Sequence, residues 1–317
     1  MRTLALFRNE AAARPWLWSL LAAIATWLAI VSVSGRGVGG TLTAAISIAP
    51  YLVIVGIGQM FVITLGNGNI DLSVPYNMSL AAFVSTEVIA NGHRSIALGF
   101  LVALACGLAV ALVNIIGIAV LLIPPIVATL ATGLLAESAT TVRASSLNVD
   151  VSASLQNFTT ANVGGITYLA FICIGLAVVA AIGLYRTTFG RAARAIGQSL
   201  RAADFAGVPV TRTIVITYIL CAELAALSGV LLGAYVSPSL GIGDPYLLDS
   251  IAVVVLGGSL IAGGRSNVPG VWASSVFLIL LGTFLNVVHI SVAYQNVVKG
   301  GLIIAVLALV GTGKESR

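Results

Sequence analysis

Long apolar runs separated by short polar breaks make up almost the whole chain. A helix needs about 20 mostly apolar residues to cross the hydrocarbon core of a bilayer, and the runs reach or approach that length. Ten candidate spans are counted, the fourth and fifth divided only by Gly117: residues 16–33, 41–65, 74–90, 96–116, 118–141, 166–185, 213–236, 247–262, 268–290 and 292–310. The pattern predicts an all-α polytopic membrane protein with about ten transmembrane helices, forming one transmembrane domain over residues 1–317.

The most informative interruption, residues 65–75, separates the second run from the third. Irregular backbone at membrane depth is tolerated only where protein or a water-filled cavity receives its polar groups. An acidic residue there is by default a functional residue. The break therefore suggests that something polar passes through the protein. Its polar residues and one glutamine in the preceding run are candidates for the pathway: Gln59, Asn67, Asn69, Asp71 and Ser73.

A second break, residues 241–246, resembles the first, because each has Gly and Asp, then Pro-Tyr, and then a new apolar run. We expect residues 67–74 and 241–246 to be non-helical and buried in protein. Spans two to five and seven to ten would then form two inverted four-helix repeats, as in many transporters. The alternative is that these breaks only end helices. Asp71 and Asp249 would then cap helix N-termini rather than contact a solute.

Composition and charge support this class of protein. The chain is 59% hydrophobic and 8% charged, against about 25% charged residues in soluble domains. The net charge of +5 indicates topology rather than nucleic-acid binding, because Lys and Arg gather on the cytoplasmic side. With the N-terminus inside, ten spans place both termini and residues 186–212 in the cytoplasm and residues 143–165 outside. The basic start resembles a signal peptide, although the first run's length favours an uncleaved anchor.

The cytoplasmic loop of residues 186–212 is rich in Ala and Arg and is punctuated by Gly197 and Gly207. This composition predicts one or two short helices that present a surface to a cytoplasmic partner. The alternative is an ordinary basic loop at the lipid headgroups. No His or Cys has a metal-ligand spacing, so no metal is expected. Asn286 and Gln295 are candidate hydrogen-bonding residues for a solute or for helix–helix contacts.

Several segments, in order along the chain, resemble one family. Residues 70–74 are similar to a GIDLSVG signature, and residues 123–132, which include Pro124 and Pro125, look like an IPxFIxTL segment. Residues 188–191, 195–197 and 207–208 match a coupling loop, residues 248–258 with 263–264 resemble an LDAIAxVVLGGxxxxGG motif, and Tyr294, Gln295 and Lys299 match a last-span pattern. The chain thus resembles the permease subunits of bacterial ABC sugar importers of the ribose/galactose/xylose type, which are related to branched-chain amino-acid permeases.

The departures concern substrate and assembly. Asn69 stands where the family has Gly, Pro75-Tyr76 replaces Gly-Ser, and Glu137 stands where Arg is frequent. These differences leave the particular sugar open. They are compatible with a member that pairs with a second, different permease.

The resemblance implies a mechanism and partners. A periplasmic solute-binding protein would deliver a sugar to a permease homodimer or heterodimer in the bacterial inner membrane. ATP-binding cassette subunits would grip the coupling loop through residues that match the family: Phe189, Gly190, Arg191, Arg194, Ala195, Gly197, Arg201 and Gly207. ATP and Mg would bind those subunits, and no cofactor is expected here, because residues 311–315 lack the spacing of a P-loop. This chain is therefore expected to be a transport subunit, not an enzyme.

Rival functions remain at this point. One is a secondary transporter driven by protons through Asp or Glu, and another is a passive facilitator. A third is an importer of amino acids or another small polar solute. The coupling loop argues against the first two, because neither needs to grip an ATPase.

Overall fold

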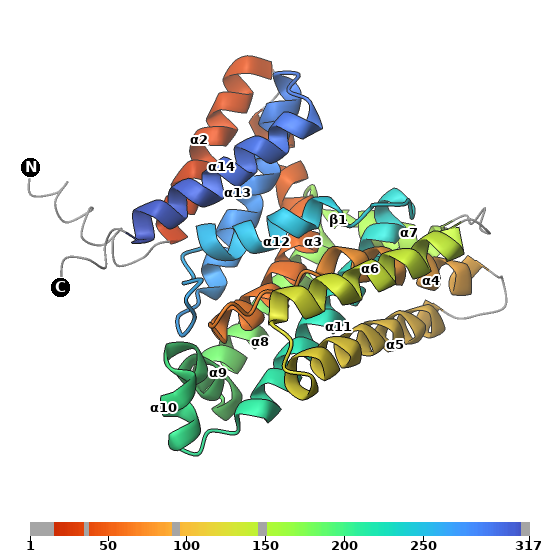
Figure 1. The fold of residues 1–317 in the computed structure, drawn as a ribbon. Helices are drawn as coiled ribbons and strands as arrows, with labels where there is room; N and C mark the ends of the chain where they lie inside the picture. Colours follow the sequence, from red (N-terminus) through yellow and green to blue (C-terminus); the bar gives the residue numbers. More distant parts are fainter. Residues whose placement is uncertain (1–15, 35–37, 91–95, 145–150, 312–317) are drawn as a thin grey trace, which may run out of the picture.

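The computed structural model describes residues 16–34, 38–90, 96–144 and 151–311 (Figure 1). Its elements are α2 (Trp16–Ser34), α3 (Val38–Thr64), α4 (Val74–Ala90), α5 (Ile96–Ile115), the π-helix η1 (Ile116–Val120), α6 (Pro125–Ala144), α7 (Ala153–Thr160), β1 (Asn162–Val163), β2 (Ile166–Thr167), α8 (Tyr168–Arg186), α9 (Thr188–Gln198), α10 (Leu200–Phe205), α11 (Val210–Val236), α12 (Pro245–Leu256), α13 (Val268–Val287) and α14 (Val292–Gly311). The described chain is helical except for loops and one antiparallel hairpin of two-residue strands.

Within the described ranges, seven helical segments are long and apolar enough to cross a membrane: residues 16–34, 39–64, 96–120, 125–144, 168–186, 210–236 and 268–287. α12 and the described apolar part of α14 are shorter. A polytopic membrane protein is therefore confirmed. About ten spans in two inverted repeats stays a prediction.

Two predicted span boundaries are wrong. The break expected at Gly117 is a π-helix, in which Leu121 N–H donates to Ile116 O at 2.9 Å. The chain leaves the helix only at residues 121–124, because each of the two prolines Pro124 and Pro125 disfavours the helical conformation in the residue before it. The eighth run was expected to extend to residue 262, but α12 ends at Leu256 and residues 257–267 are not helical.

The helix α3 forms the centre of the bundle. It is buried without interruption from Ala49 to Thr64, and it contacts α8, α11, α12 and α13. On the far side of α11 lie α4 and α5. Glycines allow these helices to approach closely: a Cβ on Gly229 of α11 would lie 2.2 Å from the carbonyl oxygen of Met78 in α4.

The two ends of the bundle differ. The short helices α9 and α10 lie at one end, and α7 with the β hairpin lies at the other (Figure 1). Both short helices are capped locally: Thr187 Oγ1 accepts from Gly190 N–H at 3.1 Å, and Ser199 Oγ accepts from Ala202 N–H at 3.3 Å. The prediction of one or two short helices within residues 189–207 is confirmed.

Candidate functional site

The first break is irregular because three successive residues adopt the left-handed conformation. Gly66, Asn67 and Gly68 have φ values of 66°, 51° and 75°, which end α3. Residues 67–73 are non-helical, as predicted, but the expected range is one residue too long, because α4 begins at Val74. The prediction that this break is buried is wrong for Asn67 and Gly68, which are exposed. The buried part begins after them.

Asp71 and Ser73 form the buried core of this break, each 1% exposed. Asp71 Oδ1 accepts hydrogen bonds from Ser73 N–H at 2.9 Å and from Ser73 Oγ at 2.5 Å. Ser73 Oγ accepts in turn from Asn114 Nδ2 of α5 at 2.9 Å. Ser73 O also accepts from Asn77 N–H, the first helical bond of α4. Asp71 therefore holds the turn that starts α4, which supports the capping alternative.

Neighbouring helices fix the rest of the break. Tyr218 Oη of α11 donates to Asn69 Oδ1 at 2.9 Å, and Asn69 Nδ2 donates to Gly66 O at 2.8 Å. The Gln59 amide faces the main chain of Asp71, with its N and O each 3.3 Å from Asp71 O and N in the orientation that satisfies both. Thr129 Oγ1 of α6 accepts from Leu72 N–H at 3.0 Å.

The structure thus brings Gln59, Asn69, Asp71 and Ser73 together with residues from α5, α6 and α11. Two amide oxygens near this turn, Asn77 Oδ1 and Asn114 Oδ1, are buried and have no hydrogen-bond partner within the described ranges. The cluster is rich in acceptors, so it can accept hydrogen bonds from water or from hydroxyl groups.

The backbone of the second break contacts α4, the helix that follows the first break. Gly243 N–H donates to Ser79 Oγ of α4 at 3.1 Å, and a Cβ on Gly243 would lie 1.9 Å from Pro75 O. The expected non-helical range is too long, since α12 already begins at Pro245. The predicted burial is wrong for Asp244 and Pro245, which are exposed.

Asp249 of α12 pairs with Lys299 of α14. Lys299 Nζ lies 2.8 Å from Asp249 Oδ2, and both residues are 8% exposed. This ion pair joins the two helices inside the protein. It accounts for the presence of both charges in apolar runs. The alternative in which Asp249 caps a helix N-terminus is wrong, because α12 begins four residues earlier, at Pro245.

Four other candidates lie outside the polar cluster. Pro124 is exposed and Pro125 is the first residue of α6. Gln295 Nε2 donates to Asn286 Oδ1 at 2.7 Å and to Ile290 O at 2.9 Å, which closes the connection between α13 and α14. These contacts support the helix-packing interpretation of Asn286 and Gln295.

The inner side of α9 packs against the bundle. The centre of the Phe189 ring lies 5.8 Å from the centre of the Phe61 ring in α3. The Arg194 guanidinium lies 5.8 Å from the centre of the Tyr185 ring. Gly190 is buried, and a Cβ there would lie 2.2 Å from Leu184 O. Ala195 packs against the core, while Arg191 and Arg201 are exposed.

A junction of glycines joins α9 to two loops of the bundle. A Cβ on Gly197 would lie 2.0 Å from Thr64 O and 2.2 Å from Gly264 N. Gly264 N–H donates to Thr64 O at 2.9 Å. A Cβ on Gly263 would lie 2.4 Å from Gly66 Cα. We name Gly66, Gly197, Gly263 and Gly264 the glycine junction.

The outer face of α9 and α10 is available to a partner. Phe205, at the end of α10, is 92% exposed, and Gly207 follows it with a φ of 76°. Phe205 was not among the predicted contact residues, although a large apolar residue between a basic helix and a glycine is a usable signal. Aromatic and Arg side chains of this kind commonly anchor protein interfaces.

Among the described residues, no three His, Cys, Asp or Glu side chains gather in an arrangement that could hold a metal ion.

Comparison with known proteins identifies the family. Residues 41–307 match the family described as branched-chain amino acid transport system / permease component. This match spans most of the chain, so the protein belongs to that family.

Several curated relatives are permeases whose names specify a sugar. The chain is 37% identical over 146 residues to the ribose import permease protein RbsC of Bacillus subtilis, covering 46% of this chain and 45% of the relative. It is 33% identical over 178 residues to the xylose transport system permease protein XylH of Haemophilus influenzae, covering 50% and 46%. It is 33% identical over 148 residues to the L-arabinose transport system permease protein AraH of Escherichia coli, covering 46% and 44%. Each alignment spans a little under half of the relative, and no solved structure matches.

Proposed function

We propose that this chain is the membrane-spanning permease subunit of an ATP-driven, binding-protein-dependent importer of a sugar or sugar-like solute. The observation that carries the proposal is the family match over residues 41–307. The relatives named for ribose, xylose and arabinose favour a sugar over an amino acid.

The helices α9 and α10 couple this permease to an ATPase subunit. Their inner side is fixed to the bundle by Phe189, Arg194 and the glycine junction. Their outer face presents Phe205 and exposed arginines. A rigid inner contact and an open outer face are what a force-transmitting element needs. ATP and Mg bind the partner subunit.

The ten-helix architecture with two inverted repeats is part of the proposal. Contacts indicate that α3 and α11 run antiparallel, because Tyr51 lies beside Ser228 whereas Gly58 lies beside Cys221. Each helix is followed by a Gly-rich break and a further helix. The first polar cluster then lies inside one subunit, and the solute pathway runs beside it, between this subunit and a second permease.

The proposed orientation places α9–α10 in the cytoplasm and α7 on the periplasmic side of the inner membrane. The two termini, which are also expected in the cytoplasm, lie outside the described residues. The basic residues of 186–212 support it through the positive-inside rule. A periplasmic binding protein would dock at the α7 end, opposite the ATPase.

The test is transport by the reconstituted complex. The chain is purified with the ATPase, binding protein and any second permease encoded beside it, and uptake of labelled ribose, xylose and L-arabinose into proteoliposomes is measured. We expect accumulation that requires both ATP and the binding protein, and none with an ATPase variant unable to hydrolyse ATP. Accumulation driven by a proton gradient without the ATPase would instead establish the secondary-transporter alternative.

A further inference from the structure

A furrow on the side of the bundle runs between α2 and α3. Both helices pack on α13, yet α2 makes few contacts with α3. Only Ser19, Ala23 and Ile30 of α2 are buried. The neighbours in sequence are therefore separated in space along the face of α13, and two cavities follow one another between them.

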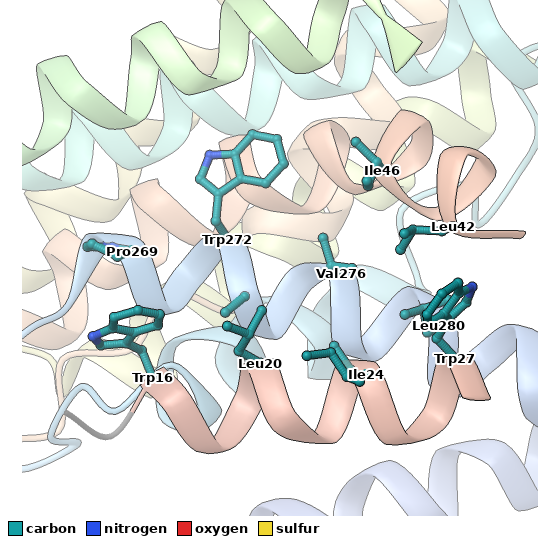
Figure 2. Close-up of a pocket in the computed structure, with 12 residues that line it drawn as sticks. Trp16, Leu20, Ile24, Trp27, Leu42, Ile46, Pro269, Trp272, Val276 and Leu280 are labelled. Carbon is teal, nitrogen blue, oxygen red and sulfur yellow. The ribbon is translucent and has the colours of Figure 1, made fainter. Parts of the chain in front are cut away.

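The first cavity has a volume of about 490 Å³, and all twelve of its lining residues are apolar or aromatic (Figure 2). Trp16, Leu20, Ile24 and Trp27 of α2 line one side, and α13 lines the base. Leu42 and Ile46 of α3 complete the wall. The second cavity, of about 390 Å³, continues between the same helices and includes three hydroxyl residues, Ser34, Thr41 and Thr283.

The dimensions of the furrow fit a lipid. The first cavity follows α2 from Trp16 to Trp27, about 16 Å of helix at ~1.5 Å per residue. This length is close to half of the roughly 30 Å hydrocarbon core of a bilayer, the share of one leaflet and so of one acyl chain.

The lining chemistry also fits. The Trp16 end lies beside Pro269, and Arg265 is exposed in the loop that leads to Pro269. A phosphate group is favoured near such a cation. The Leu20 and Ile24 side chains at the rim are 40% and 45% exposed, so the furrow opens sideways toward the membrane.

We propose that this furrow holds an acyl chain of a membrane phospholipid, with the lipid phosphate near Arg265. The lipid fills the space between α2 and α3 and completes the seating of α2 on α13. The proposal needs only the membrane-spanning fold and does not rest on the solute or the ATPase.

One test counts retained lipid. The intact transporter complex is purified in mild detergent, and bound phospholipid is measured by native mass spectrometry. Ala273→Phe fills the base of the first cavity, whereas Ala109→Phe adds the same group to an exposed position on α5. We expect Ala273→Phe to lose at least half of a phospholipid that both wild type and Ala109→Phe retain. Equal retention by the two variants would overturn the proposal.

The second test does not depend on the folding of a filled variant. Three of the chain's four tryptophans, Trp16, Trp27 and Trp272, line the first cavity, so Trp18→Phe leaves only these as reporters. In phosphatidylglycerol vesicles with brominated acyl chains, we expect their emission to fall by half or more, equally in the isolated chain and in the assembled complex. Protection on assembly would show a protein, such as a second permease, in the furrow and would overturn the proposal.

Discussion

At the scale of single residues, the absence of a side chain is a requirement at several places where the backbone segments meet. Gly197 lies against Thr64 O and Gly264 N at distances that no Cβ tolerates. The contacting atoms are backbone, so they move only if α3 or the loop after α12 moves with them. The glycine junction therefore ties α9 to two separate parts of the bundle.

Gly197→Ala should destabilise the protein by about 1–3 kcal/mol, the usual cost of overpacking, and should reduce uptake. The measurements are thermal unfolding of the purified chain and transport in proteoliposomes. Gly175→Ala in α8 is the matched control, because no atom lies within 4 Å of a Cβ there. Indistinguishable unfolding of the two variants would show that the junction adapts freely.

Asp71→Ala should destabilise the protein by about 1–3 kcal/mol, because Ser73 N–H loses its acceptor while buried. Asp71→Asn keeps an acceptor oxygen in the same place and should restore most of the loss. Unfolding and uptake of both variants check this. If Asn is as damaging as Ala, the charge of Asp71, not its turn geometry, is what the protein uses.

At the scale of elements, what the sequence predicted was the existence of helices rather than their ends. Apolar content located most of the helices and both breaks, because burial in lipid selects side chains by polarity. Apolar content did not predict where α12 ends. Leu260 and Ile261 are apolar, but the chain around them is not helical, because Gly258 and Gly263 adopt φ values of 86° and 90°.

The polar cluster was predictable only in part, for a related reason. Asn69, Asp71 and Ser73 were recognised because they interrupt an apolar run. Tyr218 was not, because a tyrosine within an apolar helix carries no sign that it meets a residue 149 positions away. Contacts between distant segments arise from packing, which a single sequence does not display.

The ion pair between α12 and α14 provides a test of an element contact. Lys299→Met alone should destabilise the protein by about 3–5 kcal/mol, because it leaves a buried carboxylate unpaired. The double variant Asp249→Leu, Lys299→Met should be much closer to wild type. A double-mutant cycle from thermal unfolding gives the coupling free energy between the two side chains. If the effects of the two single substitutions on stability simply add, the buried ion pair is contradicted.

The α10 surface makes a separate prediction about binding. Phe205→Ala should change stability by no more than about 0.5 kcal/mol, since the side chain is exposed. If α10 contacts the ATPase as proposed, the substitution should weaken binding of that subunit by about 2 kcal/mol, as expected for an interface anchor. Co-purification of the ATPase measures this, with Leu240→Ala, also exposed, as the control. If both variants recover the same amount of ATPase, the ATPase contact lies away from Phe205.

At the scale of the whole molecule, the proposed orientation can be tested by labelling. In a chain whose three cysteines are replaced, Ser199→Cys between α9 and α10 should resist an impermeant thiol reagent added to intact cells. Asn157→Cys in α7 should react, since Asn157 is exposed at the opposite end. Ready labelling of Ser199→Cys from outside would show that the molecule has the opposite orientation, with the arginines of α9 in the periplasm.

The position of α2 has a consequence for how the chain is made. Its packing surface lies on α13, whose first residue follows the last residue of α2 by 234 positions. At about 5–20 residues per second, the ribosome needs between roughly 10 and 50 s to produce that partner. During this interval α2 lies among lipids without most of its final protein contacts. Its side chains must therefore all be uncharged, which explains why a helix that packs on a protein neighbour carries, besides apolar residues, only Ser19, Thr26, Ser32 and Ser34.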